Sequence, residues 1–197
     1  MSQDKVDSAK ASVKVTIIGS GLVGKSWALI FARAGHSVVL YDSDEKQTQT
    51  ALPSILKDAQ MLQDAGLLQA NQTPQSVVAH VSLAHKLEDA IQGATYIQEC
   101  VPEALTIKTK VYEDLDRILS SSVSDSSATA STSASAAGAV AASPSPAFPS
   151  TLLLPVLASS TSNIASSQFT HKLKVRAQCL VAHPVNPPFA IPLVEIV

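Results

Sequence analysis

Three glycines and one aspartate have the spacing that most clearly predicts chemistry in this sequence. Gly19, Gly21 and Gly24 follow an apolar run at the spacing G-x-G-x-x-G. Asp42 comes 18 residues after Gly24, at the end of the next apolar run. Glycines at this spacing allow a tight strand-to-helix turn, close approach of the backbone to a pyrophosphate, and close packing of the helix on the strand. An acid at this distance accepts hydrogen bonds from ribose hydroxyls and repels a 2′-phosphate, so the pattern predicts NAD rather than NADP.

The sequence around the glycines strengthens this interpretation, because a glycine triplet alone also occurs by chance. Apolar residues recur at helical spacing after the turn, Gly35 is placed to end that helix, and residues 37–41 read as a strand. The first turn of such a helix offers unpaired N–H groups and the positive end of a dipole to phosphates. The alternative is a βαβ unit in which the glycines serve only the turn and Asp42 merely begins the next helix.

Polar side chains that could act on a substrate follow the predicted strands in the last quarter of the chain. Residues 159–162 read Ser-Ser-Thr-Ser, His183 follows the next strand, and Glu195 lies 12 residues further on. Ligands bind at the carboxyl ends of strands in open α/β sheets. A dehydrogenase needs a base for the hydroxyl proton, and histidine suits that role near neutral pH. Glu195 could orient the imidazole and stabilise its charged form.

Each of these residues also has a purely structural interpretation. His183 lies in Ala-His-Pro-Val-Asn-Pro-Pro and could be a strand-end histidine whose ring is satisfied by the backbone. Glu195 could face solvent from an edge strand, and the serine run could cap a helix. Spacing alone does not bring His183 and Glu195 together.

Composition limits the class of protein. The chain has 197 residues, 46% of them hydrophobic, which is enough for one substantial core. A net charge of −2 gives no basic footprint for nucleic acid or an anionic membrane, and no apolar run approaches a membrane span. No metal-ligand spacing occurs, and Cys100 and Cys179 lie in apolar runs, which predicts buried thiols in a reducing compartment. Because residues 1–12 are polar and resemble no targeting signal, we expect a cytoplasmic protein.

The candidate cofactor-binding and catalytic residues must be positioned by strands that alternate with helices. We expect a helix from Ser43 that Pro53 kinks or divides, a strand over 77–81, a helix over 83–91, a strand over 95–101 and a helix over 107–119. Strands are also expected over 152–157, 179–182 and 193–197. This alternation predicts a Rossmann-type α/β fold, doubly wound around a mostly parallel sheet.

Residues 120–150 interrupt the pattern. Of these 31 residues, 26 are Ser, Ala, Thr or Pro, and Asp125 carries the one charge. Such a segment buries too little apolar surface to offset its ordering entropy, so we expect a low-complexity, disordered insertion. The domain organisation predicted is therefore a disordered tail over 1–12 and one NAD-binding domain over 13–197, interrupted at 120–150.

Three strings resemble one known family: VTIIGSGLVGKSWALIFARAGHSVVLYD, YIQECVPEALTIK and CLVAHPVNPPFAIPLVEIV. They are similar to the 3-hydroxyacyl-CoA dehydrogenase family, and most similar to its lambda-crystallin branch, which includes L-gulonate 3-dehydrogenase. The resemblance covers residues 13 to about 119 and 155–197, nearly everything outside the insertion.

The resemblance implies roles for individual residues. Cofactor contacts fall on Leu22, Val23, Asp42, Glu103 and Lys108. The catalytic base falls on His183, its carboxylate partner on Glu195, and the residue that binds the substrate hydroxyl on Ser162. For Glu103 and Lys108 the simpler alternative is an ordinary helix start, with an acid early and a lysine that faces water.

The family also implies a helical domain after the strand of Glu195, which closes over the substrate and forms most of a homodimer contact, and this sequence does not include it. We therefore expect an NAD-dependent oxidoreductase fragment that acts on the 3-hydroxy group of a small molecule, either a 3-hydroxyacyl-CoA or a sugar acid such as L-gulonate. We expect it to bind NAD weakly or moderately and to turn over poorly. The alternatives are a non-catalytic, crystallin-like nucleotide-binding module and a truncated gene product without activity.

Overall fold

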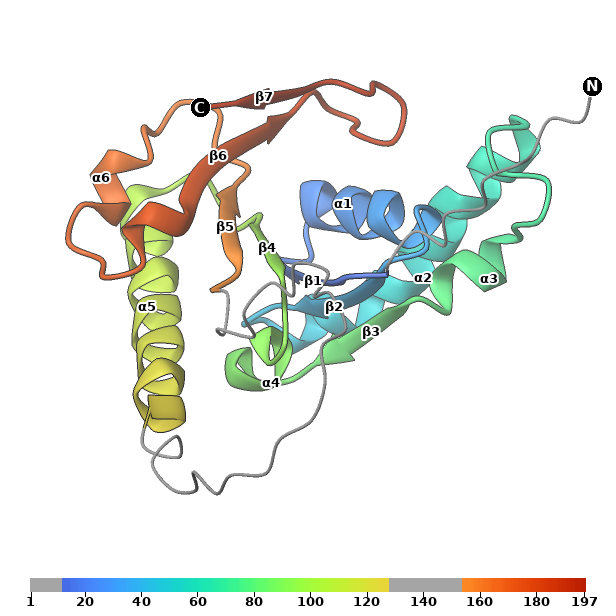
Figure 1. The fold of residues 1–197 in the computed structure, drawn as a ribbon. Helices are drawn as coiled ribbons and strands as arrows, with labels where there is room; N and C mark the ends of the chain where they lie inside the picture. Colours follow the sequence, from blue (N-terminus) through green and yellow to red (C-terminus); the bar gives the residue numbers. More distant parts are fainter. Residues whose placement is uncertain (1–11, 128–153) are drawn as a thin grey trace, which may run out of the picture.

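The computed structural model describes residues 12–127 and 154–197, with side chains up to residue 121 in the first of these ranges. A seven-stranded sheet with the order β3-β2-β1-β4-β5-β6-β7 forms its centre (Figure 1). All neighbouring pairs are parallel except β6 and β7. The strands are β1 (Lys14–Ile18), β2 (Ser37–Tyr41), β3 (Val81–Ala84), β4 (Tyr96–Glu99), β5 (Val156–Ser159), β6 (Cys179–Pro184) and β7 (Val194–Ile196).

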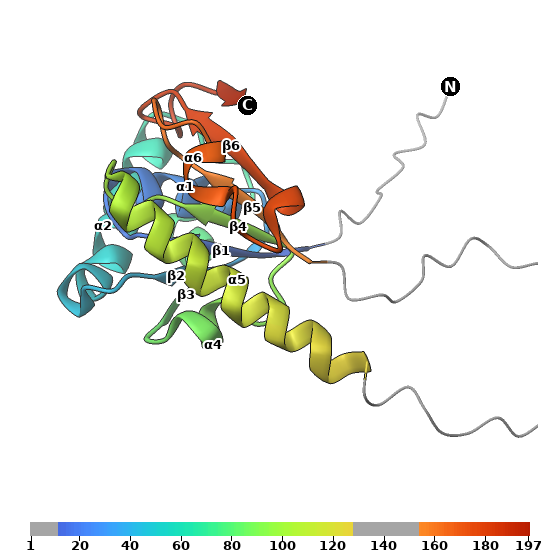
Figure 2. The ribbon, with the colours of Figure 1, turned by 90° about the vertical axis from the view of Figure 1, so that its left-hand side faces the viewer.

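Helices cover both faces of the sheet, which confirms the doubly wound Rossmann-type fold. They are α1 (Leu22–Arg33), α2 (Glu45–Asp64), α3 (Pro74–Val78), α4 (Leu87–Ile91), α5 (Leu105–Ser127) and α6 (Ser167–Thr170), with a 3-10 turn at Arg176–Gln178. One hydrophobic cluster packs on each face of the sheet. The first joins β1 and β2 to α1, α2 and α3, and the second joins β4 and β5 to α4, α5 and α6. Figure 2 views the molecule from the side of α5.

Alternation along β1 explains how one strand supports both layers. Val15 and Ile17 are fully buried in the cluster of α1, whereas Ile18 belongs to the cluster of α5. Side chains of successive strand residues point to opposite faces, so an unbroken apolar run is what a strand covered on both sides requires.

The prediction of α1 and β2 is confirmed, including the end of α1 at Gly35. Ala34 is the C-cap, and Gly35 follows it with φ +82°, a conformation that glycine adopts without strain. The expected N-cap Ser43 is wrong by one residue, because the Asp44 side chain accepts from the Lys46 N–H.

The expected division of the helix at Pro53 and the strand expected over 77–81 are both wrong. Pro53 does not divide α2, which runs continuously from Glu45 to Asp64. Pro53 and Gln49, whose carbonyl loses its partner, are both exposed, so water can hydrate that carbonyl. The strand expected over 77–81 begins only at Val81. Residues 74–78 are helical because Thr73 and Ser76 form a capping box and Pro74, between them, occupies the first turn of the helix.

The prediction of a disordered insertion over 120–150 is wrong at the start of that range. α5 continues to Ser127, eight residues into the predicted insertion of 120–150, since serine is compatible with a helix that is already nucleated. The rest of that insertion and the predicted tail, apart from Ser12, lie outside the described residues. The helix expected over 83–91 is shorter, because residues up to Ala84 complete β3.

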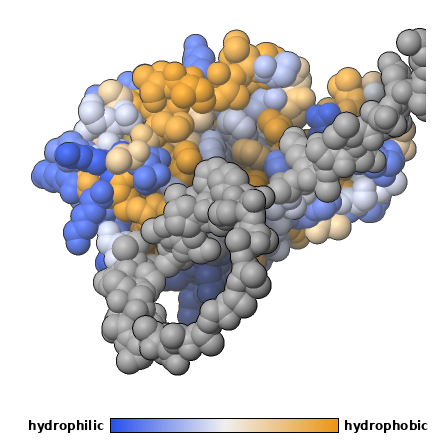
Figure 3. Space-filling view, in the orientation of Figure 1, coloured by the Kyte–Doolittle hydropathy of each residue, from blue (hydrophilic) through white to orange (hydrophobic). Residues whose placement is uncertain are grey.

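The β6–β7 hairpin carries an exposed apolar surface. It lies above α1 in Figure 1, and Figure 3 shows apolar residues gathered along it. Phe189 packs into the α1-side core, whereas Leu193, Ile196 and Val197 are 54%, 65% and 82% exposed. Within the described ranges, no helix is long and apolar enough to cross a membrane.

Candidate functional site

The turn between β1 and α1 requires glycine at two positions for steric reasons. Gly19 has φ +97°, and a Cβ there would lie 2.7 Å from the Cys100 carbonyl oxygen. A Cβ on Gly24 would lie 1.8 Å from the carbonyl oxygen of Gly19. Gly21 differs, because nothing stands within 4 Å of a Cβ there. Gly21 is the N-cap of α1 and no side chain caps this helix, so its first N–H groups are open to a ligand.

A cavity of about 810 Å³ opens at this turn, across the carboxyl ends of β1, β2 and β4. Side chains of α5 at helical spacing, including Ile107, Val111 and Asp114, form part of its wall. Six of the residues expected to bind a cofactor line it, namely Gly19, Gly21, Leu22, Val23, Asp42 and Glu103. The cavity lies where the strand order reverses between β1 and β4, which is the ligand site of open α/β sheets.

Asp42 lines the cavity with its carboxylate held from two sides. Oδ2 accepts from the N–H of Ser20 at 2.7 Å and from the Ser20 hydroxyl at 2.9 Å. Oδ1 accepts from the N–H of Asp44 at 2.9 Å. The carboxylate is therefore fixed in place and keeps lone pairs for ribose hydroxyls.

Glu103 joins the cavity to the loop after β5. Oε1 accepts from the Thr161 hydroxyl at 2.5 Å, from the Ser162 N–H at 3.0 Å and from the Asn163 N–H at 3.3 Å. Burial alone would raise the pKa of Glu103, but the bonds from Thr161 and Ser162, the Lys108 ammonium and the bond from Asn163 outweigh it and lower the pKa. Glu103 is thus a carboxylate at neutral pH.

Lys108 does not face water, so the ordinary helix-start interpretation is wrong for this residue. Its side chain is 1% exposed, lies 2.9 Å from Glu99 and 3.3 Å from Glu103, and is not part of the cavity lining. The direct contact with a cofactor that the resemblance implies for Lys108 stays a prediction.

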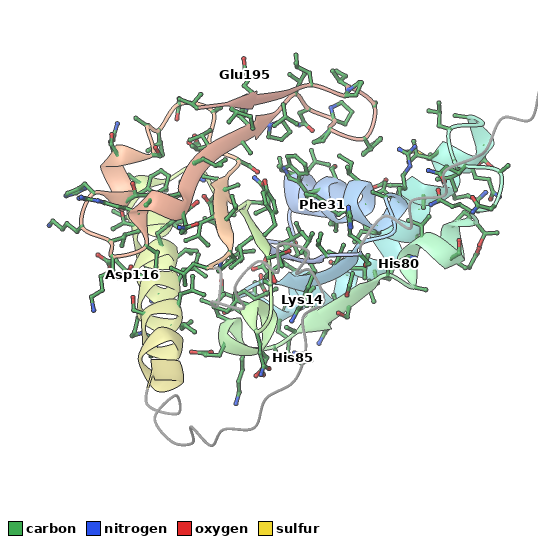
Figure 4. All side chains as sticks on the ribbon, in the orientation of Figure 1. Lys14, Phe31, His80, His85, Asp116 and Glu195 are labelled. Carbon is green, nitrogen blue, oxygen red and sulfur yellow. The ribbon has the colours of Figure 1, made fainter. Side chains whose placement is uncertain are left out.

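His183 and Glu195 meet across the antiparallel pairing of β6 and β7. They are register partners, and His183 Nδ1 lies 2.7 Å from Glu195 Oε2. The alternative in which the backbone satisfies the His183 ring is therefore wrong for Nδ1, whose partner is a carboxylate. Glu195 also faces solvent from an edge strand, as the alternative held, with 62% of its side chain exposed (Figure 4).

Ser162 follows β5 in a loop, and His183 lies near the carboxyl end of the neighbouring parallel strand β6. Ser159, the last residue of β5, pairs with Val181 of β6, and His183 lies two residues further along β6. Ser162 is exposed in the loop that follows. The serine run does not cap α6, which begins only at Ser167; instead Thr161 Oγ1 accepts from the Ile164 N–H at 3.1 Å.

Comparison with known proteins decides the family. The model of the 3-hydroxyacyl-CoA dehydrogenase NAD-binding domain matches residues 14–148 and 154–197. The chain belongs to this family. Its cofactor is NAD, and the residues around the cavity fit that cofactor: a glycine turn at an uncapped helix start, and an aspartate on the neighbouring strand.

Relatives confirm the lambda-crystallin branch of the 3-hydroxyacyl-CoA dehydrogenase family. The human lambda-crystallin homolog is 36% identical over 183 residues, which cover 93% of this chain and 47% of that protein. L-carnitine dehydrogenase/betainyl-CoA thioesterase of Agrobacterium fabrum is 28% identical, over 94% of this chain and 31% of that protein. The chain spans about half the length of the lambda-crystallin homologs it matches.

The fold is shared with solved structures. Mycobacterium tuberculosis FadB2 superposes with a TM-score of 0.71 at 22% identity, over 95% of this chain and 54% of that chain.

Two fully buried polar residues of β4, Gln98 and Glu99, were missed from sequence. Glu99 sits inside Glu-Cys-Val-Pro-Glu at the end of an apolar strand and is fully buried against Lys108 and Ser159. The Ser160 hydroxyl accepts from Gln98 Nε2 at 2.7 Å and from Trp27 Nε1 at 3.2 Å at the edge of the cavity. Polar residues in an otherwise apolar strand were the signal, because buried polar groups need partners.

The cysteines are free and partly buried, and no disulfide joins them. Cys100 lines the cavity beside Ser160, and burial raises the pKa of its thiol. Burial likewise raises the pKa of Cys179, to about 11. No cluster of metal-ligating side chains occurs in the part of the chain that the structure describes.

Proposed function

We propose that this chain is the cofactor-binding half of an NAD-dependent dehydrogenase that oxidises the 3-hydroxy group of a 3-hydroxyacyl-CoA or of a 3-hydroxy sugar acid such as L-gulonate. The observation that carries the proposal is the 2.7 Å contact between His183 Nδ1 and Glu195 Oε2, at the same end of the sheet as the NAD cavity. A base with an orienting carboxylate is what removal of a hydroxyl proton requires.

Each polar residue has a distinct task in this proposal. Nδ1–H of His183 donates to Glu195, which leaves Nε2 as the acceptor of the substrate hydroxyl proton. Glu195 holds the ring and stabilises the imidazolium, and Ser162 donates a hydrogen bond to the substrate oxygen. When bound, NAD supplies the acceptor for the hydride that leaves the alcohol carbon.

The residues that line the cavity bind the cofactor in this proposal. Asp42 would accept hydrogen bonds from the ribose hydroxyls of the adenosine half, and the N–H groups of Leu22 and Val23 at the start of α1 would hold the pyrophosphate. Cytoplasmic location, homodimerisation through a following helical domain, and the absence of nucleic-acid or membrane partners stay predictions.

Binding is the first test. Trp27 is the single tryptophan of the chain, and its indole contacts Ser160 at the cavity. NADH absorbs where tryptophan emits, so we expect saturable quenching of Trp27 emission by NADH. The absence of saturable quenching and of any calorimetric binding signal at millimolar NADH would overturn the proposal.

Turnover is the second test. NADH formation is followed at 340 nm with L-gulonate, 3-hydroxybutyryl-CoA and L-carnitine, the last because a relative is named for it. We expect slow turnover of one of the first two that disappears in His183→Ala while NADH binding stays. NADH binding with no turnover of any substrate favours the non-catalytic module instead.

A further inference from the structure

The side chain of Gln98 is buried inside the sheet and has no task in the proposed chemistry. It is 0% exposed and does not line the cavity. Its Nε2 donates to the Ser160 hydroxyl at 2.7 Å and to the Ala182 carbonyl at 3.3 Å. The first acceptor directly follows β5 and the second lies in β6, so one side chain of β4 is bonded to both of the next two strands (Figure 1).

The Ala182 carbonyl lies just beyond the pairing of β5 with β6. The Ser160 N–H donates to the last carbonyl of β4 at 2.8 Å. Because successive residues of a central strand bond to opposite neighbours, the next donor toward β6 would be the Thr161 N–H. That N–H instead donates to Ser159 Oγ at 3.2 Å. Gln98 therefore supplies β6 with the donor that β5 no longer offers.

Tyr96 fixes which way the Gln98 amide faces. Its hydroxyl donates to Gln98 Oε1 at 2.5 Å, and burial raises the pKa of this phenol, so the group stays a donor. Because Oε1 accepts from Tyr96, Nε2 is the end of the amide that meets Ser160 and Ala182. Trp27 Nε1 donates to the same Ser160 hydroxyl at 3.2 Å. This network therefore holds the amide in one orientation.

We propose that Gln98 is a positioning residue for Ser162 and His183, the two residues assigned to the substrate hydroxyl. Ser160 lies two positions before Ser162. Ala182 directly precedes His183. Without the amide, both segments lose a bond next to a group that must meet one substrate oxygen. A misplacement of about 1 Å costs on the order of 100-fold in rate. The catalytic part of this inference rests on the proposed function.

The experiment compares Gln98→Met with a matched control. Gln98→Met removes the amide at similar volume. Thr16→Val is the control, because Thr16 is also 0% exposed and its hydroxyl donates to the buried Ala90 carbonyl at 2.7 Å, on the α4 side of the sheet. Tyr96→Phe removes only the hydroxyl that orients the amide. It should change each quantity in the same direction by a smaller amount, and it keeps the test decisive where Gln98→Met fails to fold.

Backbone hydrogen exchange reads the position of β6 without any turnover. The N–H groups of Val181 and Val185, on either side of His183, bond across the β6–β7 hairpin. In Gln98→Met we expect both amides to exchange at least about tenfold faster than in wild type. Thr16→Val should change their exchange rates less than about twofold. An equal rise in both variants would assign Gln98 a merely structural role and overturn the inference.

Turnover and NADH affinity test the catalytic part. For the substrate that wild type oxidises, we expect Gln98→Met to lower kcat at least about tenfold. The NADH affinity measured by calorimetry should change less than about twofold, and Thr16→Val should change neither quantity. An unchanged kcat in Gln98→Met would overturn the inference. Wild-type protein that oxidises no substrate would instead overturn the proposed function, and the exchange rates would then decide whether Gln98 positions β6.

Discussion

His183 and Glu195 face each other across the pairing of β6 with β7, with 2.7 Å between Nδ1 and Oε2. The two residues are 12 positions apart in the chain. They meet because the chain turns back after β6 and the three residues of β7 pair with it. In the proposed mechanism this contact leaves Nε2 of the ring as the nitrogen that accepts a proton from the substrate.

The first prediction concerns this pair. His183→Ala should lower any alcohol-oxidising turnover by at least about 100-fold, the range of general base catalysis, and should change NADH affinity less than about twofold. Glu195→Gln keeps an acceptor for Nδ1–H and should lose less activity than Glu195→Ala. Steady-state rates at 340 nm and Trp27 quenching measure both quantities. Loss of NADH binding in His183→Ala would show that β6 shapes the cavity directly.

The second prediction separates the glycines. Gly21→Ala meets no atom and should change the melting temperature less than about 2 °C, yet weaken NADH binding at least about tenfold by filling the approach to the α1 N-terminus. Gly24→Ala forces a Cβ against the Gly19 carbonyl and should lower the melting temperature by more than about 5 °C. Differential scanning calorimetry decides; equal melting temperatures would contradict the steric argument.

The third prediction concerns cofactor choice. Asp42→Asn keeps an acceptor for Ser20 but removes the charge that repels a 2′-phosphate, so the preference for NADH over NADPH should fall at least about fivefold. Ser20→Ala removes only the hydroxyl bond to Oδ2 and should change the preference less. Parallel titrations with both cofactors measure the ratio. An unchanged ratio in Asp42→Asn would place discrimination elsewhere in the cavity.

The fourth prediction follows from the lowered pKa of Glu103. A carboxyl whose folded pKa lies below its ordinary value of 4.5 stabilises the fold fully above that value and loses the contribution as pH falls through the folded pKa. Wild type should therefore melt above Glu103→Gln at pH 7, and the two curves should converge in more acidic buffer. A difference that is constant from pH 7 to pH 3 would contradict an ionised Glu103.

The fifth prediction concerns the thiols. With pKa values raised by burial, to about 11 for Cys179, both remain protonated near pH 8. In the folded protein, both thiols should react with a thiol reagent at least about tenfold more slowly than free cysteine. In denaturant, both should react at the same rate as free cysteine. NADH should slow Cys100 further because that residue lines the cavity, whereas Cys179 should be unaffected.

The sequence by itself determined the Rossmann unit of β1, α1 and β2. Its signals are local: an apolar strand, steric demands at Gly19 and Gly24, helical periodicity, and Gly35 at the helix end. The same locality placed Asp42, because its position follows from the length of one βαβ unit. Local signals failed over residues 74–81, where a capping box outcompeted an apolar strand pattern.

The tertiary structure decided everything that depends on strand order and side-chain reach. Only the sheet order put Asp42 and Glu103 on opposite sides of the glycine turn, and only the turn of the chain into β7 brought Glu195 to His183. Lys108 shows the same limit: an amphipathic helix pattern does not reveal that a lysine lies buried between Glu99 and Glu103. Periodicity reports which face a residue occupies, whereas partners across a sheet are set by long-range pairing that no local pattern encodes.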